Sequence, residues 1–178
     1  EIDGVSGELT VESVSGSIEI EGDAKALDLE AVSGSIEVEA SVEQLEVETV
    51  SGRIRLRGEA EEIEADTVSG SIDLSTGGVR RADLSTTSGG IDLDGSLAGR
   101  AEIEIESHSG SVELNLPSST SARFRVETYS GRIDNELGPP AKRTGRYTPE
   151  KKLEFSLGDG EARIVIDTFS GSVRLRRQ

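Results

Sequence analysis

The chain has no cysteine, methionine or tryptophan, and aromatic residues make up only 3% of its 178 positions. The lack of cysteine excludes disulfides, thiolate metal sites and cysteine nucleophiles, and it leaves the redox compartment open. The scarcity of aromatic rings argues against a globular core built around large side chains. Isoleucine, leucine and valine dominate the apolar content, which favours a core of stacked aliphatic strands.

Basic residues are also scarce, since 19 Lys and Arg against 35 Asp and Glu give a net charge of -16. Such a surface repels nucleic-acid phosphates and anionic membranes, whereas basic partners and cations are compatible with it. No apolar run approaches the ~20 residues of a membrane-spanning helix, and no signal segment is recognisable. Because the chain begins at Glu1 without methionine, we expect a piece of a longer protein, which would reach a membrane only through an upstream anchor.

What the sequence has in abundance is one repeat, written most fully as Ala-Val-Ser-Gly-Ser-Ile-Glu-Val-Glu at residues 31–39. Its Ser-Gly pair recurs along the whole chain, with the glycine at positions 7, 16, 34, 52, 70, 89, 110, 131 and 171. Successive glycines are 18 residues apart through the middle, then 19, 21 and 21, and finally 40, which is long enough to hold a coil without Ser-Gly. A single repeat from end to end predicts one elongated domain, residues 1–178.

Apolar and polar residues alternate on both sides of each Ser-Gly, for example in residues 45–50 and 54–56. This period of two predicts β-strands, and no stretch has the 3.6-residue period of a helix. One strand pair cannot bury its apolar face alone, but coils stacked on one another bury a continuous column. We therefore predict an all-β fold, a parallel β-solenoid (single-stranded β-helix) with coils of 18–21 residues. Right-handed winding is expected because parallel crossovers prefer that hand.

The regularity of the repeat divides the domain into three parts. Residues 1–22, with two glycines nine residues apart, predict an incomplete first coil, and residues 23–137 predict the regular coils. Residues 138–178 begin with Gly-Pro-Pro and a basic loop, and they predict irregular C-terminal coils. If the coils stack in sequence order, one end of an acidic rod carries the basic residues Lys142, Arg143, Arg146, Lys152, Arg174, Arg176 and Arg177. Charge at an exposed end strand can repel or attract another copy, so the oligomeric state stays open.

Aligning the coils at the glycine places equivalent residues ~4.8 Å apart along the axis and shows which columns face inward. Two inward columns are almost purely aliphatic: Val47, Ala65, Leu84, Ile105, Val126 and Ile166, and Ile18, Ile36, Ile54, Ile72, Ile91, Val112, Ile133 and Val173. A third column is small and mostly hydroxyl-bearing: Ser13, Ala31, Thr49, Thr67, Thr86, Ser107, Thr128 and Thr168. We expect its hydroxyls to hydrogen-bond along the stack or to corner backbone.

The Ser-Gly pair is interpreted as a structural corner rather than as a catalytic serine. Glycine suits a positive φ or a neighbouring coil too close for a Cβ, and a serine hydroxyl can bond turn backbone. The predicted corner glycines are Gly16, Gly34, Gly52, Gly70, Gly89, Gly110, Gly131 and Gly171.

Three stretches together resemble a known family. They are Thr-Val-Ser-Gly-Ser-Ile-Asp-Leu at residues 67–74, residues 117–131 ending in Tyr-Ser-Gly, and Gly-Asp-Gly at 158–160 followed by Ile-Asp-Thr-Phe-Ser-Gly. Over essentially the whole chain they resemble a bacterial family of β-strand-repeat proteins, the "putative adhesins" of unknown function. The resemblance implies a right-handed β-helix in the cell envelope, periplasmic or at the cell surface, often with a membrane or lipid anchor. It brings no catalytic residues.

Ladders of outward-facing carboxylates are the first candidate site. Like charges ~4.8 Å apart repel by about 1 kcal/mol per pair in water before salt screening. Calcium prefers oxygen ligands, so it is the one cofactor considered, with Glu30, Glu48 and Asp66 as its candidate ligands. We favour the competing interpretation, a solvated face that keeps the protein soluble, because no EF-hand or repeat-in-toxin loop holds these carboxylates.

A mixed ladder on the second strand of each coil supports the register. Stacking at a spacing of 18 residues places Arg55 between Glu37 and Asp73, and Arg57 beside Glu39. Opposite charges in register stabilise each step modestly.

The position before each Ser-Gly is the second candidate, a partner surface. It holds valine in the first coils and His108, Tyr129 and Phe169 in later ones. If strand alternation continues to the corner, these side chains face outward beside the acids and can bind a protein or glycan partner. If the corner rotates them, they lie under a neighbouring loop, and the sequence is compatible with both arrangements.

No catalytic constellation stands out. His108 is the only histidine, and its neighbours Glu106 and Ser109 are ordinary members of repeat columns, so a hydrolase triad is not indicated. We therefore predict a noncatalytic cell-envelope β-helix that acts as a scaffold or as an adhesion and binding module. The alternative is a polysaccharide-active β-helix enzyme, although carboxylate pairs on every coil single out no site.

Overall fold

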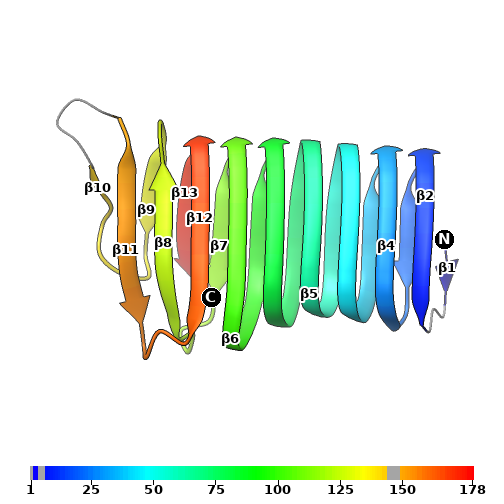
Figure 1. Ribbon diagram of the computed structural model, residues 1–178, viewed down its shortest axis with the longest axis horizontal. Coiled ribbons are helices and arrows are strands. Elements are labelled where there is room, and N and C mark those ends of the chain that lie inside the picture. The colour runs from blue at the N-terminus through cyan, green and yellow to red at the C-terminus, as the bar shows by residue number, and fades with distance from the viewer. Residues whose placement is uncertain (1, 4–6, 144–148) are drawn as a thin grey trace.

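The computed structural model describes residues 2–3, 7–143 and 149–178. Across these residues the chain forms β-strands joined by bends and turns. The same residues contain no helix long and apolar enough to cross a membrane. The coils stack along one axis into an open rod, with the N-terminus at one end (Figure 1). The prediction of an all-β fold with a mostly parallel sheet is confirmed.

In the part of the chain that the structure describes, thirteen strands form one sheet that winds around the rod. Strand bonding often continues through the bends, so β5 alone covers 53 residues, almost three periods of the repeat. The strands are β1 (Ile2–Asp3), β2 (Glu8–Ser15), β3 (Ile18–Glu21), β4 (Ala24–Ser33), β5 (Ile36–Ser88), β6 (Ile91–Ser109), β7 (Val112–Leu116), β8 (Ala122–Thr128), β9 (Arg132–Asn135), β10 (Lys142–Arg143), β11 (Lys151–Leu157), β12 (Ala162–Ser170) and β13 (Ser172–Arg177).

The register between coils follows the spacing of the Ser-Gly repeat. Leu9 pairs with Leu27 and Leu27 with Leu45, a step of 18 residues each time. The longer glycine spacings are absorbed between β5 and β6, where an irregularity separates the pairs on either side of Val79. Because the side chains on both sides of this irregularity stay in register, every column of equivalent side chains continues into the later coils.

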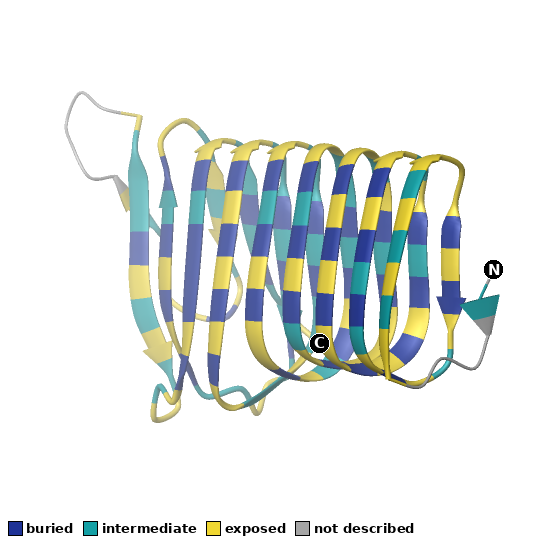
Figure 2. Ribbon diagram, turned by 45° about the vertical axis from the view of Figure 1, so that its right-hand side comes forward, coloured by how far each residue is buried: buried dark blue, intermediate teal, exposed yellow. Residues whose placement is uncertain are grey.

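Side chains alternate between core and surface along nearly every strand (Figure 2). The aliphatic columns predicted to face inward are buried over most of the rod, and only Ile133 near the far end is partly buried. A fully buried aliphatic side chain contributes roughly 1.5–3 kcal/mol relative to exposure. The stability of the core therefore comes from many aliphatic side chains along the rod, each contributing a small free energy, rather than from one large cluster of aromatic rings.

The C-terminal coil does not lie at the end of the rod, contrary to the stacking in sequence order that we expected. β12 is inserted between β6 and β8, so that Ile166 pairs with Ile105 on one side and with Val126 on the other. β13 is likewise parallel to both β7 and β9. In Figure 1 the C-terminus accordingly lies in the middle of the stack.

Charges on the second strand of the coil are compatible with this order, although on the first strand it places Arg163 beside Arg123 and Asp167 between Glu106 and Glu127. Stacking in sequence order would place Glu113 beside Asp134, two like charges one coil apart. The inserted strand places Arg174 between them, paired in register with both, and its guanidinium lies 3.4 Å from the Glu113 carboxylate. Arg163 contacts Glu102 at 3.2 Å on the other face of the same coil. Each exposed pair is worth little alone, but like charges directly opposite destabilise a sheet.

An antiparallel pair closes the far end. β11 runs antiparallel to β8, with Phe155 stacked on the buried Phe124 at 4.6 Å, and β10 pairs with β11. The prediction of positive charge at this end is thus only partly correct. Lys142 and Lys152 lie on the end strands, whereas the C-terminal arginines lie on the inserted coil. Arg146 lies outside the described residues.

The corner glycines form one unbroken column because neighbouring coils approach too closely for a Cβ. A Cβ added at Gly34 would lie 1.9 Å from the carbonyl oxygen of Gly16, and one at Gly110 would lie 1.7 Å from that of Gly89. No real Cβ makes such a contact. In stacking order the column is Gly16, Gly34, Gly52, Gly70, Gly89, Gly110, Gly171 and Gly131.

The hydroxyl column beside these corners is buried from Thr49 onward, and the expected hydrogen bond to corner backbone is seen at Ser13, which donates to the carbonyl oxygen of Ser15. Among the described residues, the side-chain oxygens of Thr49, Thr67, Thr86, Ser107, Thr128 and Thr168 have no hydrogen-bond partner. Equivalent atoms repeat every ~4.8 Å along the axis, whereas an O–H···O bond spans about 2.5–3.0 Å. Hydroxyls in register therefore cannot bond along the stack, and the threonines act as small packing residues.

Gly110→Ala should destabilise the fold by about 3 kcal/mol, because the new methyl group meets backbone that cannot move without separating two coils. Gly110 has no positive φ, so the contact alone is tested. Gly99→Ala is the matched control, since a Cβ there meets nothing within 4 Å. Chemical denaturation of both variants measures the difference, and equal stabilities would contradict the close-approach explanation.

Candidate functional site

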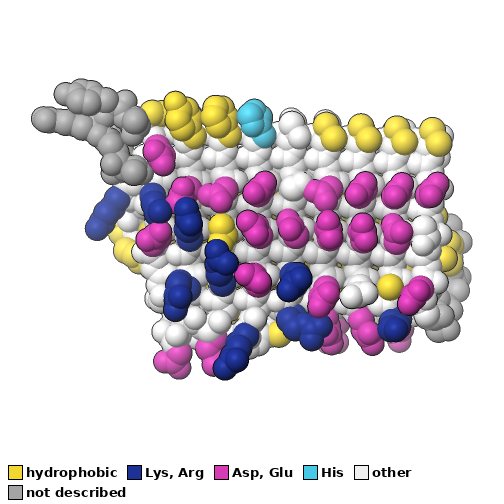
Figure 3. Space-filling view, viewed as in Figure 1, with side chains coloured by type: hydrophobic (Ala, Val, Ile, Leu, Met, Phe, Trp, Pro, Cys, Tyr) yellow, Lys and Arg dark blue, Asp and Glu magenta, His cyan; other side chains and the backbone are white. Residues whose placement is uncertain are grey.

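One face of the rod carries three parallel columns of side chains (Figure 3). The apolar column lies along the edge and consists of Val14, Val32, Val50, Val68, Thr87, His108, Phe169 and Tyr129. The first acidic column lies beside it and consists of Glu12, Glu30, Glu48, Asp66, Ser85, Glu106, Asp167 and Glu127. The second acidic column follows, with Asp28, Glu46, Glu64, Asp83 and Glu104.

The apolar column faces solvent rather than a covering loop, which settles the choice that the sequence left open. Val14 is 76% exposed, and Val32, Val50 and Val68 are each about half exposed. A row of β-branched apolar side chains is therefore exposed at the same position of successive coils. Large contiguous apolar patches mark interaction surfaces.

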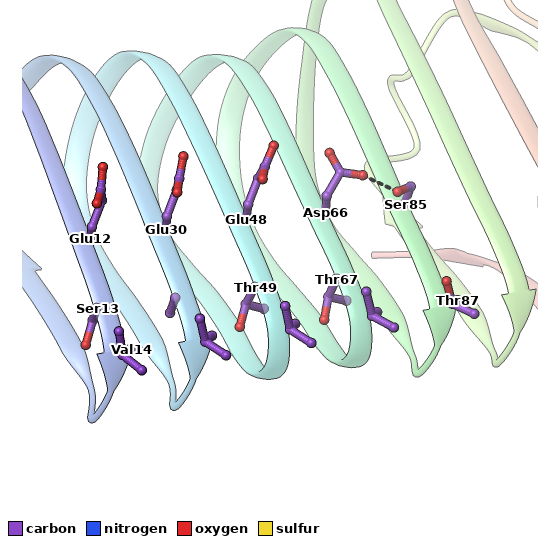
Figure 4. A pocket seen from close by; sticks show the side chains of 14 residues that line it. Glu12, Ser13, Val14, Glu30, Glu48, Thr49, Asp66, Thr67, Ser85 and Thr87 are labelled. Carbon is purple, nitrogen blue, oxygen red and sulfur yellow. Dashed lines mark hydrogen bonds between the residues drawn. The ribbon is translucent and has the colours of Figure 1, made fainter.

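A shallow groove runs between the apolar column and the first acidic column. Figure 4 shows its N-terminal part, with a volume of about 530 Å³, where Glu12, Glu30 and Glu48 form one wall and the valines the other. The strand segment between the walls, which includes Thr49, forms the floor. A second hollow of about 520 Å³ continues it past the shared residue Thr87 to Tyr129. We call this continuous feature the edge groove.

The three rings of the apolar column form a stack because the C-terminal coil is inserted. Phe169 lies between His108 and Tyr129, with ring centroids 5.0 Å and 5.1 Å away and planes within 7° of parallel. Sequence reasoning selected all three residues but placed Phe169 beyond Tyr129. Stacking covers the ring faces with one another, so the rings present mainly their edges to the groove.

Carboxylates in the N-terminal half of the groove lack compensating charge. The pKa of Glu30 is raised by partial desolvation and by the like charges of Glu12 and Glu48 above and below it. In the second acidic column the pKa of Glu64 is raised in the same way, by desolvation and then by Glu46. The structure thus brings the predicted ladders together as repelling columns.

The C-terminal end of the same column is compensated. Lys152 lies 2.8 Å from the Glu127 carboxylate and lowers its pKa by hydrogen bonding, with Arg125 adding to the effect at 2.9 Å. Sequence reasoning missed these two cations, because Lys152 reaches the column only through the antiparallel pairing of β11 with β8.

The calcium candidates Glu30, Glu48 and Asp66 lie in the first acidic column, one on each of three successive coils. Asp66 accepts a hydrogen bond from Ser85 of the next coil. Nowhere in residues 2–3, 7–143 and 149–178 do three or more His, Cys, Asp or Glu side chains converge as a metal site. Calcium binding therefore stays a prediction.

On the opposite face the arginines occupy the positions that the mixed ladder predicted. Arg55 lies 3.2 Å from Glu37, and Arg57 lies 2.8 Å from Glu39. This confirms the register of the second strand in the middle coils. The pairing is not continuous along this face, since Asp92 further along lies among like charges, and desolvation followed by Glu113 and Asp73 raises its pKa.

Comparison with known proteins gives a family but no assigned activity. The family described as Toastrack DUF4097 matches residues 1–176. No curated protein matches the chain. A solved structure described as a "putative cell adhesion protein" from Clostridium sporogenes is similar with 13% identity and a TM-score of 0.36, over 81% of this chain. This chain spans 56% of the length of that structure.

Glu30→Gln should raise the melting temperature at pH 7 and low salt, because it removes one charge from a repelling column. A raised pKa in the folded state makes the wild-type protein gain stability as the pH falls through that pKa, so the advantage of the variant should vanish near pH 4.

Glu127→Gln, in the same column, should lower the melting temperature at pH 7 instead, since it removes a carboxylate whose pKa is lowered. Thermal melts between pH 4 and 8 measure both, and shifts of the same sign would contradict this electrostatic account.

Proposed function

The chain belongs to the Toastrack DUF4097 family, and on that premise we propose that it is a noncatalytic binding module of the bacterial cell envelope. It acts as an elongated scaffold, a right-handed β-solenoid, and holds a protein or glycan partner along the edge groove. The envelope location rests on the resemblance of the repeat to bacterial adhesins. Adhesion is accordingly the role we assign to the module.

The exposed apolar column is the observation that carries this proposal. A purely structural strand would place polar residues at these outward positions, as the two neighbouring columns do. Instead, Val32, Val50 and Val68 keep an apolar side chain that is about half exposed in each coil. Exposure of this kind costs solvation free energy in the isolated protein, and a partner that covers it recovers that cost.

The alternative from the sequence, a polysaccharide-active enzyme, needs one carboxylate pair that differs from the rest. The described acids repeat from coil to coil, and the shifted pKa values follow from position in the columns. Glu30 and Glu64 have raised pKa values for the same reasons, so neither is set apart as a general acid. One neighbouring pair differs: burial and then the Glu127 charge raise the pKa of Asp167, whereas hydrogen bonds from Lys152 and Arg125 lower the pKa of Glu127. A cleavage assay tests whether this pair is catalytic.

One experiment separates the two functions. The protein is screened on immobilised glycans and extracellular proteins, and any polysaccharide that binds is also assayed for cleavage. We expect binding without turnover. The variant Val32→Ser/Val50→Ser should weaken that binding about tenfold, because two apolar contacts are lost.

Gln44→Ser is the matched control, since Gln44 is exposed on the same face but outside the edge groove. It should leave binding unchanged. Measured turnover on a bound polysaccharide would show that the protein is an enzyme, and equal binding by both variants would show that the groove is not the contact surface.

A further inference from the structure

We propose that the occupant of the edge groove is a cationic, apolar segment of a partner protein. Its apolar side chains pack on the apolar column while its Lys or Arg side chains pair with the first acidic column. This inference rests on the proposed binding function and specifies the chemistry of the partner. It follows from four properties of the groove.

The first property is that the two walls have different chemistry along the same line. One wall is the valine row, and the other is the carboxylate row of Glu12, Glu30 and Glu48. Within the described residues, none of these three carboxylates takes part in an ion pair. A partner with apolar groups on one side and cations on the other satisfies both walls at once.

The second property is the electrostatic strain in the acidic wall. Glu30 lies between Glu12 and Glu48, and partial desolvation followed by these two like charges raises its pKa. A cation placed between neighbouring coils is attracted by carboxylates on both, so its binding relieves repulsion as well as forming new pairs. A neutral partner would leave that repulsion in place.

The third property is the orientation of the aromatic rings, which favours a protein over a glycan. Sugar rings bind by packing their faces on exposed aromatic faces. Here Phe169 stacks between His108 and Tyr129 at 5.0–5.1 Å, which covers both of its own faces and one face of each neighbouring ring. Ring edges and valine methyl groups suit the side chains of a peptide.

The fourth property is an asymmetry along the groove. Its N-terminal half has the uncompensated carboxylates, whereas Lys152 and Arg125 neutralise Glu127 at the other end. The cationic part of the partner should therefore lie over the valine coils and a more apolar part over the ring stack. Seven steps of ~4.8 Å make the groove about 34 Å long, which accommodates roughly ten residues of extended chain.

Calorimetry with synthetic ten-residue peptides tests the proposal on the full chain. The probe alternates Lys and Leu, and the reference peptide alternates Lys and Ser with the same charge. We expect the Lys-Leu peptide to bind at least tenfold more tightly, and its affinity to fall with salt. Glu30→Gln/Glu48→Gln should weaken it about fivefold, through the loss of two exposed ion pairs.

The matched control is Glu19→Gln/Glu21→Gln, which changes the net charge equally but alters exposed residues of β3 on the opposite face. It should leave the affinity unchanged. Equal weakening by both double variants would mean that any polycation binds this acidic protein, and it would overturn the proposal. All four sites are exposed, so melting curves can verify that both variants are folded.

The outcomes separate this inference from the proposed function. If the screen finds a glycan whose binding depends on Val32 and Val50, and the Lys-Leu peptide does not bind, the cationic partner is wrong while the binding module stands. If neither the glycans, the screened proteins nor the peptides bind in a groove-dependent way, both proposals fail.

Discussion

Hydrogen bonding between coils is the constraint on which the rest of this structure depends. It fixes the coil spacing at ~4.8 Å, whatever side chains the coils carry. At the corner that spacing leaves no room for a Cβ, and glycine therefore occupies the column from Gly34 to Gly131, whereas Gly16 at the first coil has a positive φ instead. In the core the same spacing lets identical aliphatic side chains stack in register, and this replaces the large aromatic core that the composition excludes.

The spacing also places equivalent surface side chains of successive coils in a row, or ladder. The effect of each ladder depends on the chemistry of its side chains. Hydroxyls in register are too far apart to bond, so the buried threonines have no partners among the described residues. Carboxylates in register repel, and this repulsion adds to the desolvation that raises the pKa of Glu30. Aromatic rings in register stack, as His108, Phe169 and Tyr129 do. The edge groove is the place where an apolar ladder and an acidic ladder run side by side, and both are left open to a partner.

Much of this arrangement was predictable from the sequence, because each coil is specified by its own local pattern. Strand alternation and the glycine spacing predicted the inward columns, the corners and the Arg55 ladder. The order of the last coils was not predictable in this way, since every coil offers its neighbours the same apolar column and the same corner. The order brings distant segments into contact, for example Arg174 between Glu113 and Asp134, and a local pattern does not specify such contacts. The exposure of the apolar column likewise depended on whether the corner rotated, which a pattern of period two does not specify.

The account depends most on the insertion of the C-terminal coil, because this insertion sets the order of the rings in the edge groove and places Phe169 between His108 and Tyr129. The chain has no cysteine, so engineered pairs report the coil order directly. In the structure His108 and Phe169 are one coil apart, whereas His108 and Tyr129 are two coils apart. A disulfide bridges Cα atoms about 4.4–6.8 Å apart but not two coil spacings. We predict that His108→Cys/Phe169→Cys forms a disulfide on mild oxidation and His108→Cys/Tyr129→Cys does not; the reverse result would show that the coils stack in sequence order.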